Sequence, residues 1–301
     1  MKSAIQEITP YIYGTTRLGH ADVPYPQREK IAQSAIDAGV WFHTSRQYDD
    51  ALEVLGNTFK NNAGSIPKLI VKIGWDNVSQ LRKVLEENLK PLGVNSIQLG
   101  QLCLGGQLAE DFANGGDCYK EFQALKDEGL VQGFVVEAFP WSSWASLKAL
   151  QAGYTHDIID GFIFYLNPLQ RFASNALWDE IHARQQPIIG MRTISGGPVH
   201  KLRDVPGFAW NKYLQARAVQ IAPIFEKSGI QSWTEFCVQF AHSFPLLQAT
   251  VGSTSREENL NEYIAATKAV QPLPEDIISE IQAIQYQWSN EFDMQAAPGT
   301  I

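Results

Sequence analysis

Two ionisable side chains stand near the ends of short apolar segments, where together they could transfer a proton. Tyr48 follows "WFHT" (residues 41–44), and Lys72 interrupts "LIVKIGW" (69–75). A lysine within an apolar strand is costly unless it is paired, functional, or able to extend its ammonium to water. An ammonium near a phenol lowers the phenol's pKa and makes it a usable proton donor. The two residues therefore predict acid–base chemistry if the fold brings them together.

The elements that must position these residues are eight short apolar runs separated by helical patterns. Near-continuous apolar runs are typical of strands covered on both faces in a parallel sheet. We expect strands at residues 11–16, 41–44, 69–73, 96–104, 130–138, 158–164, 187–191 and 246–252. Helical periodicity fills the gaps, and a further helix is expected near residues 274–290.

Eight parallel strands can form an open doubly wound sheet or a closed (β/α)8 barrel. The doubly wound dinucleotide fold carries GxGxxG after its first strand, whereas the first strand here leads into "GTTRLGH". The sequence also lacks the P-loop pattern GxxxxGK[ST] and a linker rich in Pro and Ser. We therefore predict one α/β domain over residues 1–301, a (β/α)8 TIM barrel with an extra C-terminal helix. Chemistry in such a barrel lies at the C-terminal ends of the strands.

Composition excludes several classes of function. The chain is 45% hydrophobic and 19% charged, which is typical of a globular protein, and its net charge of -8 argues against a nucleic-acid or anionic-membrane surface. No apolar stretch is long enough to span a membrane, and "MKSAIQEITP" lacks the apolar core of a secretory signal. Three cysteines predict neither a disulfide framework nor a metal cluster. We expect a cytoplasmic protein that acts on a small molecule without a metal.

The segments "AIDAGVWFHTSRQYDDALEVLG", "LIVKIGW" and "VGSTSREENLNE" resemble motifs of the aldo-keto reductase superfamily. In "AIDAGVWFHTSRQYDDALEVLG", as in that family, a helix ending in DAG leads to a strand, and the catalytic tyrosine follows five residues after the family's aspartate. "LIVKIGW" resembles the strand of the catalytic lysine, and "VGSTSREENLNE" resembles the loop and helix at the cofactor's adenosine. The resemblance runs in order through most of the chain. It implies a barrel that reduces carbonyls with NADP or NAD, with Tyr48 as proton donor and Lys72 tuning it.

Two of the family's four catalytic positions carry other residues here. His43 stands where the family places a carboxylate facing the lysine, and Cys103 stands where a histidine would orient the substrate carbonyl. Because an imidazole does not balance an ammonium, we expect Lys72 to be less firmly protonated and Tyr48 less acidified. Cys103 offers only a weak S–H donor; it is either a simple buried residue or, beside cations, a reactive thiolate.

The cofactor positions also differ from the family pattern. Glu137 begins the pair that replaces the Ser-Asn grip on the nicotinamide amide, and Arg192 replaces the lysine of a "GMK" branch. Ser253 and Asn259 stand where basic residues often hold the 2′-phosphate, and only Arg256 could substitute for them. Helix N-terminal amides could still receive an anion. The predicted cofactor-binding residues are Gly14, Thr15, Thr16, Glu137, Arg192, Gly252, Ser253, Thr254, Ser255, Arg256 and Asn259.

The residues are compatible with three functions. The first is a divergent aldo-keto reductase that interconverts a small carbonyl compound and its alcohol. The second is a non-redox acid–base enzyme, such as an isomerase, dehydratase or lyase, that uses the same titratable groups. The third is a catalytically silent relative on the same fold. Residues 195–213 have the composition of either a lid or an ordinary surface loop.

Overall fold

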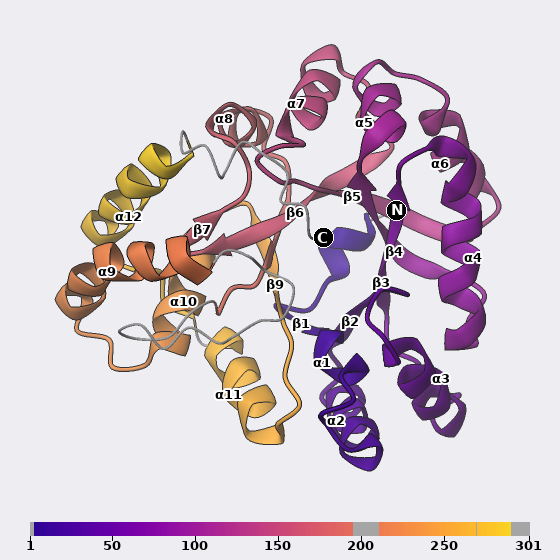
Figure 1. Ribbon diagram of the computed structural model, residues 1–301, viewed down its shortest axis with the longest axis horizontal. Helices are drawn as coiled ribbons and strands as arrows, with labels where there is room; N and C mark the ends of the chain where they lie inside the picture. The colour runs from indigo at the N-terminus through magenta and orange to yellow at the C-terminus, as the bar shows by residue number, and fades with distance from the viewer. Residues whose placement is uncertain (1–2, 195–210, 269, 290–301) are drawn as a thin grey trace.

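A closed barrel of parallel strands forms the centre of the molecule (Figure 1). The computed structural model describes residues 3–194, 211–268 and 270–289. Its barrel strands are β1 (Tyr11–Gly14), β2 (Trp41–Thr44), β3 (Leu69–Trp75), β4 (Ile97–Leu104), β5 (Val131–Glu137), β6 (Ile159–Asn167), β8 (Ile188–Met191) and β9 (Leu247–Gly252). Each pairs in parallel with the next, and β9 pairs with β1 to close the ring. The predicted (β/α)8 barrel is confirmed, and β7 (Gln170–Arg171) adds a short antiparallel pairing to β6.

Helices form the outer ring around the strands (Figure 1). They are α1 (Thr16–Gly19), α2 (Tyr25–Asp37), α3 (Ala51–Asn61), α4 (Leu81–Leu92), α5 (Gly106–Ala113), α6 (Cys118–Asp127), α7 (Ser143–Ala152), α8 (Asn175–Ala183), α9 (Asn211–Ser228), α10 (Trp233–His242), α11 (Glu257–Lys268) and α12 (Glu275–Trp288). A 3-10 turn, η2 (Val78–Gln80), precedes α4. The helix expected near residues 274–290 is α12. The segment predicted as a lid or loop falls outside the described residues as far as residue 210.

The outer faces of the strands pack on this ring through aromatic side chains. Phe42 of β2 contacts Phe59 of α3, with ring centroids 6.2 Å apart. Phe134 of β5 lies 5.0 Å from Phe122 of α6 in the same measure. Each such side chain leaves water on folding, which contributes roughly 25 cal/mol per Å² of apolar surface buried.

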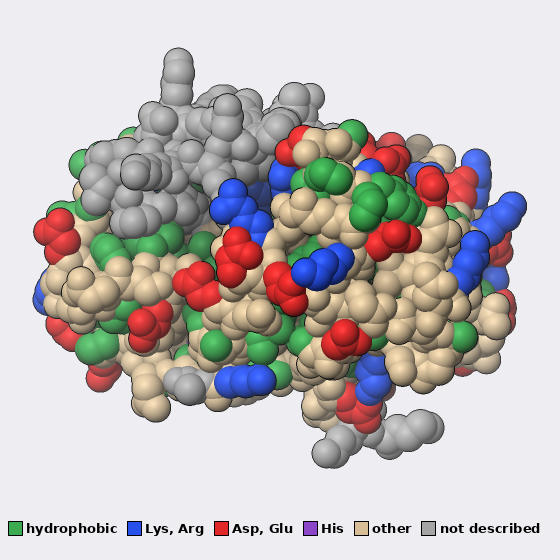
Figure 2. Space-filling view, turned by 90° about the horizontal axis from the view of Figure 1, so that it is seen from below, with side chains coloured by type: hydrophobic (Ala, Val, Ile, Leu, Met, Phe, Trp, Pro, Cys, Tyr) green, Lys and Arg blue, Asp and Glu red, His purple; other side chains and the backbone are tan. Residues whose placement is uncertain are grey.

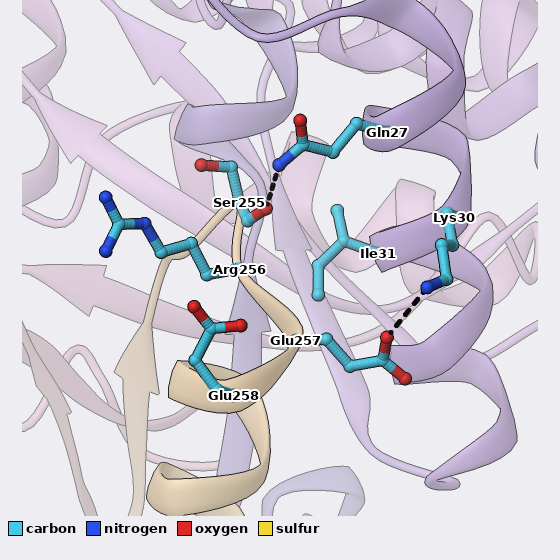
Figure 3. Close-up of a pocket in the computed structure, with 7 residues that line it drawn as sticks. All are labelled: Gln27, Lys30, Ile31, Ser255, Arg256, Glu257 and Glu258. Carbon is cyan, nitrogen blue, oxygen red and sulfur yellow. Dashed lines mark hydrogen bonds and ion pairs between the residues drawn. The ribbon is translucent and has the colours of Figure 1, made fainter.

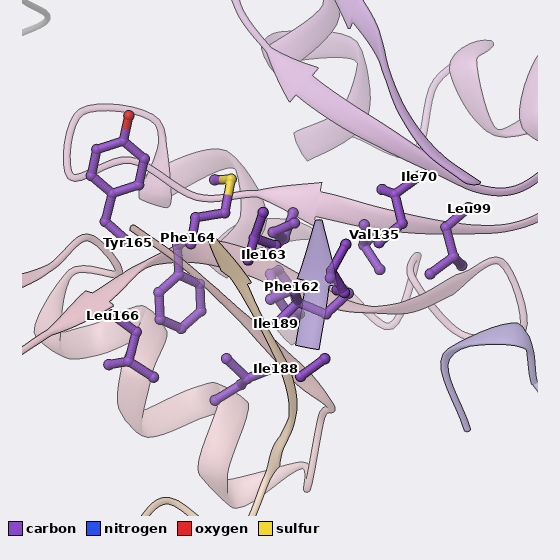
Figure 4. Packing of buried hydrophobic residues seen from close by; sticks show 14 of the residues in the cluster. Ile70, Leu99, Val135, Phe162, Ile163, Phe164, Tyr165, Leu166, Ile188 and Ile189 are labelled. Atoms are coloured by element: carbon purple, nitrogen blue, oxygen red, sulfur yellow. The ribbon is translucent and has the colours of Figure 1, made fainter. Parts of the chain in front are cut away.

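The inner faces of the strands form an apolar layer inside the barrel. Because successive strand residues point to opposite faces, the neighbours of the outward phenylalanines point inward. Figure 4 shows members of this layer, and five of them come from five different strands: Ile70, Leu99, Val135, Ile163 and Ile189. Burial on both faces explains why the strands read as continuous apolar runs rather than alternating ones.

The chain covers the N-terminal end of the barrel with a short turn. The 3-10 turn η1 (Ala4–Glu7) contacts β4, β5 and β6, and Ile5 is buried there. Ser3 donates a hydrogen bond to the Asp160 carboxylate, which also accepts one from the Phe134 N–H at 2.9 Å. Functional groups are therefore expected at the opposite, C-terminal end.

The surface carries charges of both signs. On the face seen in Figure 2, the described Lys and Arg side chains alternate with Asp and Glu rather than gathering into one basic area. Among the described helices, none combines the length and the apolar character that crossing a bilayer requires.

A glycine at the contact of two outer helices generates a stability prediction. A Cβ added to Gly56 of α3 would lie 2.1 Å from the Pro91 carbonyl oxygen of α4. We expect Gly56→Ala to lower the free energy of unfolding by about 1–3 kcal/mol, because the two backbones must separate. Urea unfolding followed by circular dichroism measures this change. The control is Gly64→Ala, since an added Cβ there meets nothing within 4 Å; equal midpoints for the two variants would contradict the prediction.

Candidate active site

Four neighbouring strands place polar side chains together above the apolar layer. His43 comes from β2, Lys72 from β3, Gln101 and Cys103 from β4, and Glu137 from β5. Lys72 pairs in register with Gln101, and Cys103 pairs with Glu137. Because side chains alternate along a strand, positions two residues beyond the apolar layer share its inner face. The register therefore assembles a polar layer at the C-terminal end of the barrel.

An ion pair between Lys72 and Glu137 lies at the centre of this layer. The Lys72 Nζ is 3.2 Å from Glu137 Oε1 and 3.3 Å from Oε2, and the two side chains are 14% and 2% exposed. Burial alone would lower the pKa of Lys72, but Glu137 and, after it, Tyr48, Cys103 and Tyr165 together outweigh burial, and the pKa lies well above its usual value. Burial likewise opposes ionisation of Glu137, yet the charge of Lys72 and the hydrogen bonds from Cys103, Gln101 and Lys72 together lower the pKa of that carboxyl. Both groups are therefore charged at neutral pH.

This pair corrects the expectation of a weakly protonated lysine. We predicted that replacement of a carboxylate by His43 would leave Lys72 less firmly protonated. The prediction is wrong because the carboxylate comes from β5 instead of β2. Sequence reasoning placed Glu137 at the cofactor and not at the lysine, although its position at the end of an apolar strand marked it as a site residue.

Cys103 is a hydrogen-bond donor to the same carboxylate. Its Sγ lies 2.8 Å from Glu137 Oε2. Burial and the negative charge of Glu137 raise the pKa of the Cys103 thiol well above its usual value. Of the two alternatives for Cys103, a buried residue and a reactive thiolate, the second is disfavoured, because burial and the carboxylate outweigh the ammonium at this sulfur.

His43 is neutral and engaged with Gln101. Its Nε2 lies 2.5 Å from Gln101 Oε1, and the imidazole is 3% exposed. Burial first, and then the Lys72 ammonium, lower the pKa of His43 to about 4. An amide oxygen can only accept, so this geometry makes Nε2 the protonated nitrogen. His43 was expected to be the partner of Lys72 or a proton relay, but its hydrogen-bond partner is Gln101. The sequence marks Gln101 as a polar residue near a strand end without giving it a role.

Tyr48 reaches the site from the loop after β2. The Lys72 Nζ lies 6.0 Å from the centroid of its ring, and the His43 ring lies 6.1 Å away between centroids. Burial raises the pKa of the Tyr48 phenol, the Lys72 ammonium opposes that increase, and Glu137 adds to it. The structure therefore brings Tyr48 and Lys72 together, and the phenol keeps its proton at neutral pH.

The loop that carries Tyr48 is held by close packing against α1. A Cβ added to Gly19 would lie 1.9 Å from the Tyr48 carbonyl oxygen, so the two loops touch backbone to backbone. The buried Arg28 donates to the Leu18 carbonyl oxygen at 2.9 Å and to the Asp50 carboxylate at 3.4 Å. One guanidinium thus joins the segments on both sides of this contact.

Aromatic side chains surround the polar layer on the β6 side. Tyr165 stacks on Phe172 with centroids 4.4 Å apart, and Phe139 stacks on Trp141 at 4.8 Å. Tyr165 influences the pKa of both Lys72 and Tyr48, and its hydroxyl points away from the aliphatic side chains in Figure 4. Sequence reasoning missed this residue, although it follows the inward Ile163 by two positions and must share its face.

Arg192 lies at the same rim. Its guanidinium carbon is 5.0 Å from the centroid of the Tyr165 ring. Its backbone has a φ of 48°, the left-handed region that few non-glycine residues adopt, and its carbonyl oxygen accepts a hydrogen bond from Asn167 Nδ2 at 3.0 Å. The turn after β8 therefore directs a cation toward the aromatic rim.

The other residues predicted to bind a cofactor lie where β1 and β9 end side by side. Gly14 belongs to β1 and pairs with His43, and Thr16 begins α1. Thr15 donates its hydroxyl hydrogen to Thr44 at 2.7 Å inside the protein. Hydrogen bonds also hold the three predicted residues at the end of β9 and just after it. The Gly252 and Thr254 carbonyl oxygens accept from the Tyr11 and Tyr13 hydroxyls. The Ser253 hydroxyl oxygen accepts from the Arg17 N–H.

An open hollow of about 380 Å³ adjoins the start of α11 (Figure 3). Its lining residues are Gln27, Lys30, Ile31, Ser255, Arg256, Glu257 and Glu258. Gln27 donates to the Ser255 carbonyl oxygen at 3.0 Å, and Lys30 pairs with Glu257 at 3.1 Å. Of the predicted residues, Ser255 and Arg256 line this hollow, whereas Asn259 of α11 does not.

Comparisons with known proteins agree on one family. Residues 10–285 match the Aldo/keto reductase family. A Klebsiella pneumoniae aldo-keto reductase in complex with NADPH superposes with a TM-score of 0.68 at 15% identity, over 93% of this chain and 92% of that one. A Pseudomonas aeruginosa protein described as an aldo-keto reductase gives 0.61 at 17% identity, over 86% and 89%. No curated protein matches the chain.

The buried imidazole generates a prediction for stability against pH. The folded-state pKa of His43 lies near 4 and the unfolded value near 6.5, so the unfolded chain binds the extra proton between these values. His43 therefore makes the free energy of unfolding depend on pH by about 3 kcal/mol. This amount of stability is fully present above pH 6.5 and is lost as the pH falls toward 4. We expect His43→Asn to show a smaller loss of unfolding free energy over that interval than the wild type. The exposed His156→Asn is the control; if both variants follow the wild-type curve, the prediction is wrong.

Proposed function

The chain belongs to the Aldo/keto reductase family, and from this premise we propose that it is an NADP(H)-dependent oxidoreductase for a small carbonyl compound. Tyr48 is the proton donor, and Lys72 is the group that makes the donation favourable. The observation that carries the proposal is the charged Lys72–Glu137 pair beside the Tyr48 phenol.

The proton chemistry follows from the charges at the site. When a carbonyl oxygen gains negative charge in the transition state, Tyr48 transfers its phenolic proton to that oxygen. The phenolate that remains is stabilised by the Lys72 ammonium, which lies 6.0 Å from the ring centroid. Positioned general acids of this kind contribute about 10² to 10⁴ in rate. The stacked aromatic rings around Tyr165 favour a flat or apolar substrate at this position.

A dinucleotide fits the residues at the far end of the site. Arg256, the Ser255 hydroxyl and the amides at the start of α11 would hold an adenosine phosphate at the hollow of Figure 3. When bound, the nicotinamide supplies the hydride. The likeness to the Klebsiella structure in complex with NADPH supports this choice of cofactor.

The same charges disfavour covalent catalysis by Lys72 or Cys103 at this site. A lysine that attacks a carbonyl must be a neutral amine, and a cysteine nucleophile must be a thiolate. Lys72 keeps its proton because of Glu137, and Cys103 keeps its proton because of burial and the same carboxylate. Proton donation from Tyr48 requires neither deprotonation.

Removal of the phenolic hydroxyl tests the proton donor. We expect wild-type protein to quench NADPH fluorescence and to oxidise NADPH with members of a panel of aldehydes and ketones. Tyr48→Phe should lower kcat/KM by about 10² to 10⁴ and leave the Kd for NADPH unchanged. The control is Tyr154→Phe, because that phenol is exposed on the surface. NADPH binding without turnover by wild-type protein would instead favour a silent relative.

Removal of one cation tests the cofactor end. We expect Arg256→Ala to raise the Kd for NADPH about tenfold and the Kd for NADH much less, because only NADPH carries the 2′-phosphate. Fluorescence titration with each dinucleotide measures both constants. Lys268→Ala, at the other end of α11, is the matched control. An equal loss for both dinucleotides would show that Arg256 does not read that phosphate.

A further inference from the structure

We propose that Glu137 is the positioning residue of this site, a carboxylate on β5 that fixes the charge and direction of the Lys72 ammonium. The proposal deepens the proposed function and rests on it. Glu137 acts through Lys72 and needs no contact with the substrate.

The contacts of Glu137 fix the position of its carboxylate. Both of its oxygens face Lys72 Nζ, at 3.2 and 3.3 Å, and Oε2 also accepts the Cys103 thiol at 2.8 Å. The side chain is almost fully buried. A carboxylate removed from water is stable only when it is paired and hydrogen-bonded, so these contacts fix the position of the negative charge.

No other described carboxylate serves Lys72. Among residues 3–194, 211–268 and 270–289, Glu137 alone forms an ion pair with its ammonium. His43 is close enough to feel the lysine's charge, but it is neutral and directs Nε2 to Gln101. Lys72 therefore depends on β5 for its counter-charge.

The geometry also orients the ammonium. An ammonium has three donors. Two carboxylate oxygens on one side occupy the donors that point toward β5 and leave a direction for the oxygen of Tyr48 or of the substrate. Loss of the carboxylate removes both the charge balance and this orientation.

The pH behaviour of Lys72 follows from every group that faces it. Glu137 from β5 favours the charged amine, as do the ionised forms of Cys103 (β4), Tyr48 (the loop after β2) and Tyr165 (β6). Burial opposes the charge. With Glu137 neutralised, burial dominates at neutral pH and the ammonium should lose its proton at a lower pH.

Competitive acetylation tests this dependence without any substrate. Wild type, Glu137→Gln, Glu137→Asp and the surface control Glu110→Gln are treated with a trace of acetic anhydride between pH 7 and 11, and mass spectrometry quantifies acetyl-Lys72. At a given pH below the wild-type transition, we expect at least tenfold faster labelling in Glu137→Gln than in wild type, which corresponds to a transition at least one pH unit lower. Glu137→Asp keeps the charge and should label like the wild type, as should Glu110→Gln. Circular dichroism checks the fold of each variant.

A double variant and the activity assay complete the test. His43→Asp combined with Glu137→Gln returns a carboxylate to the layer from β2, and we expect slow labelling of Lys72 to return. In the reductase assay, Glu137→Gln should lower kcat at least tenfold and shift the alkaline limb of the pH profile of kcat to lower pH. Wild-type labelling in Glu137→Gln, or fast labelling in Glu137→Asp, would overturn the proposal. If the labelling follows the expected pattern but neither the wild type nor any variant shows reductase activity, the proposed function is wrong and the effect of Glu137 on Lys72 still stands.

Discussion

The buried ion pair between Lys72 and Glu137 is the interaction on which the site depends. Two charges removed from water are stable only together, because the loss of one partner leaves an uncompensated charge at a cost of about 3–5 kcal/mol. Here the pair also holds the Cys103 thiol and lies beside Tyr48. Together with burial, it sets the charge state of the groups nearby: a charged amine, a protonated thiol and a neutral imidazole.

Barrel closure makes this pair possible. Glu137 and Lys72 are 65 residues apart in the chain and lie on strands separated by β4. Lys72 lies opposite Gln101 of β4, and Glu137 lies opposite Cys103, the next inward-facing residue of β4, so the two side chains meet across that strand on the inner face of the barrel. A shift of one residue in β5 would direct the carboxylate at the helices instead, and the same shift in β3 would direct the ammonium there. The apolar layer below, with Ile70 and Val135, thus secures the chemistry above it.

Much of the fold was predictable from the sequence, whereas the ion pair and hydrogen bonds of the site were not. Continuous apolar runs separated by helical patterns identify strands buried on both faces, and eight of them indicate a barrel. Lys72 could be identified because it is a charged residue within an apolar strand. Tyr48 could be identified because it follows the end of another apolar strand. The partner of Lys72 was missed because an ion pair across three strands depends on register, which the sequence states only indirectly. Tyr165 was missed for a different reason: within an aromatic run, a phenol that faces inward looks like any core residue.

The contact of Gly19 with the Tyr48 carbonyl oxygen has a consequence for protein engineering. In such barrels the loops at the C-terminal ends of the strands set the chemistry, and it changes as they vary. In this chain the segment between β1 and α2 contacts the segment between β2 and α3 backbone to backbone, with no room for a side chain at Gly19. Arg28 donates hydrogen bonds to both segments. A graft that replaces either loop alone would displace the phenol, so the two must be transplanted as a single module.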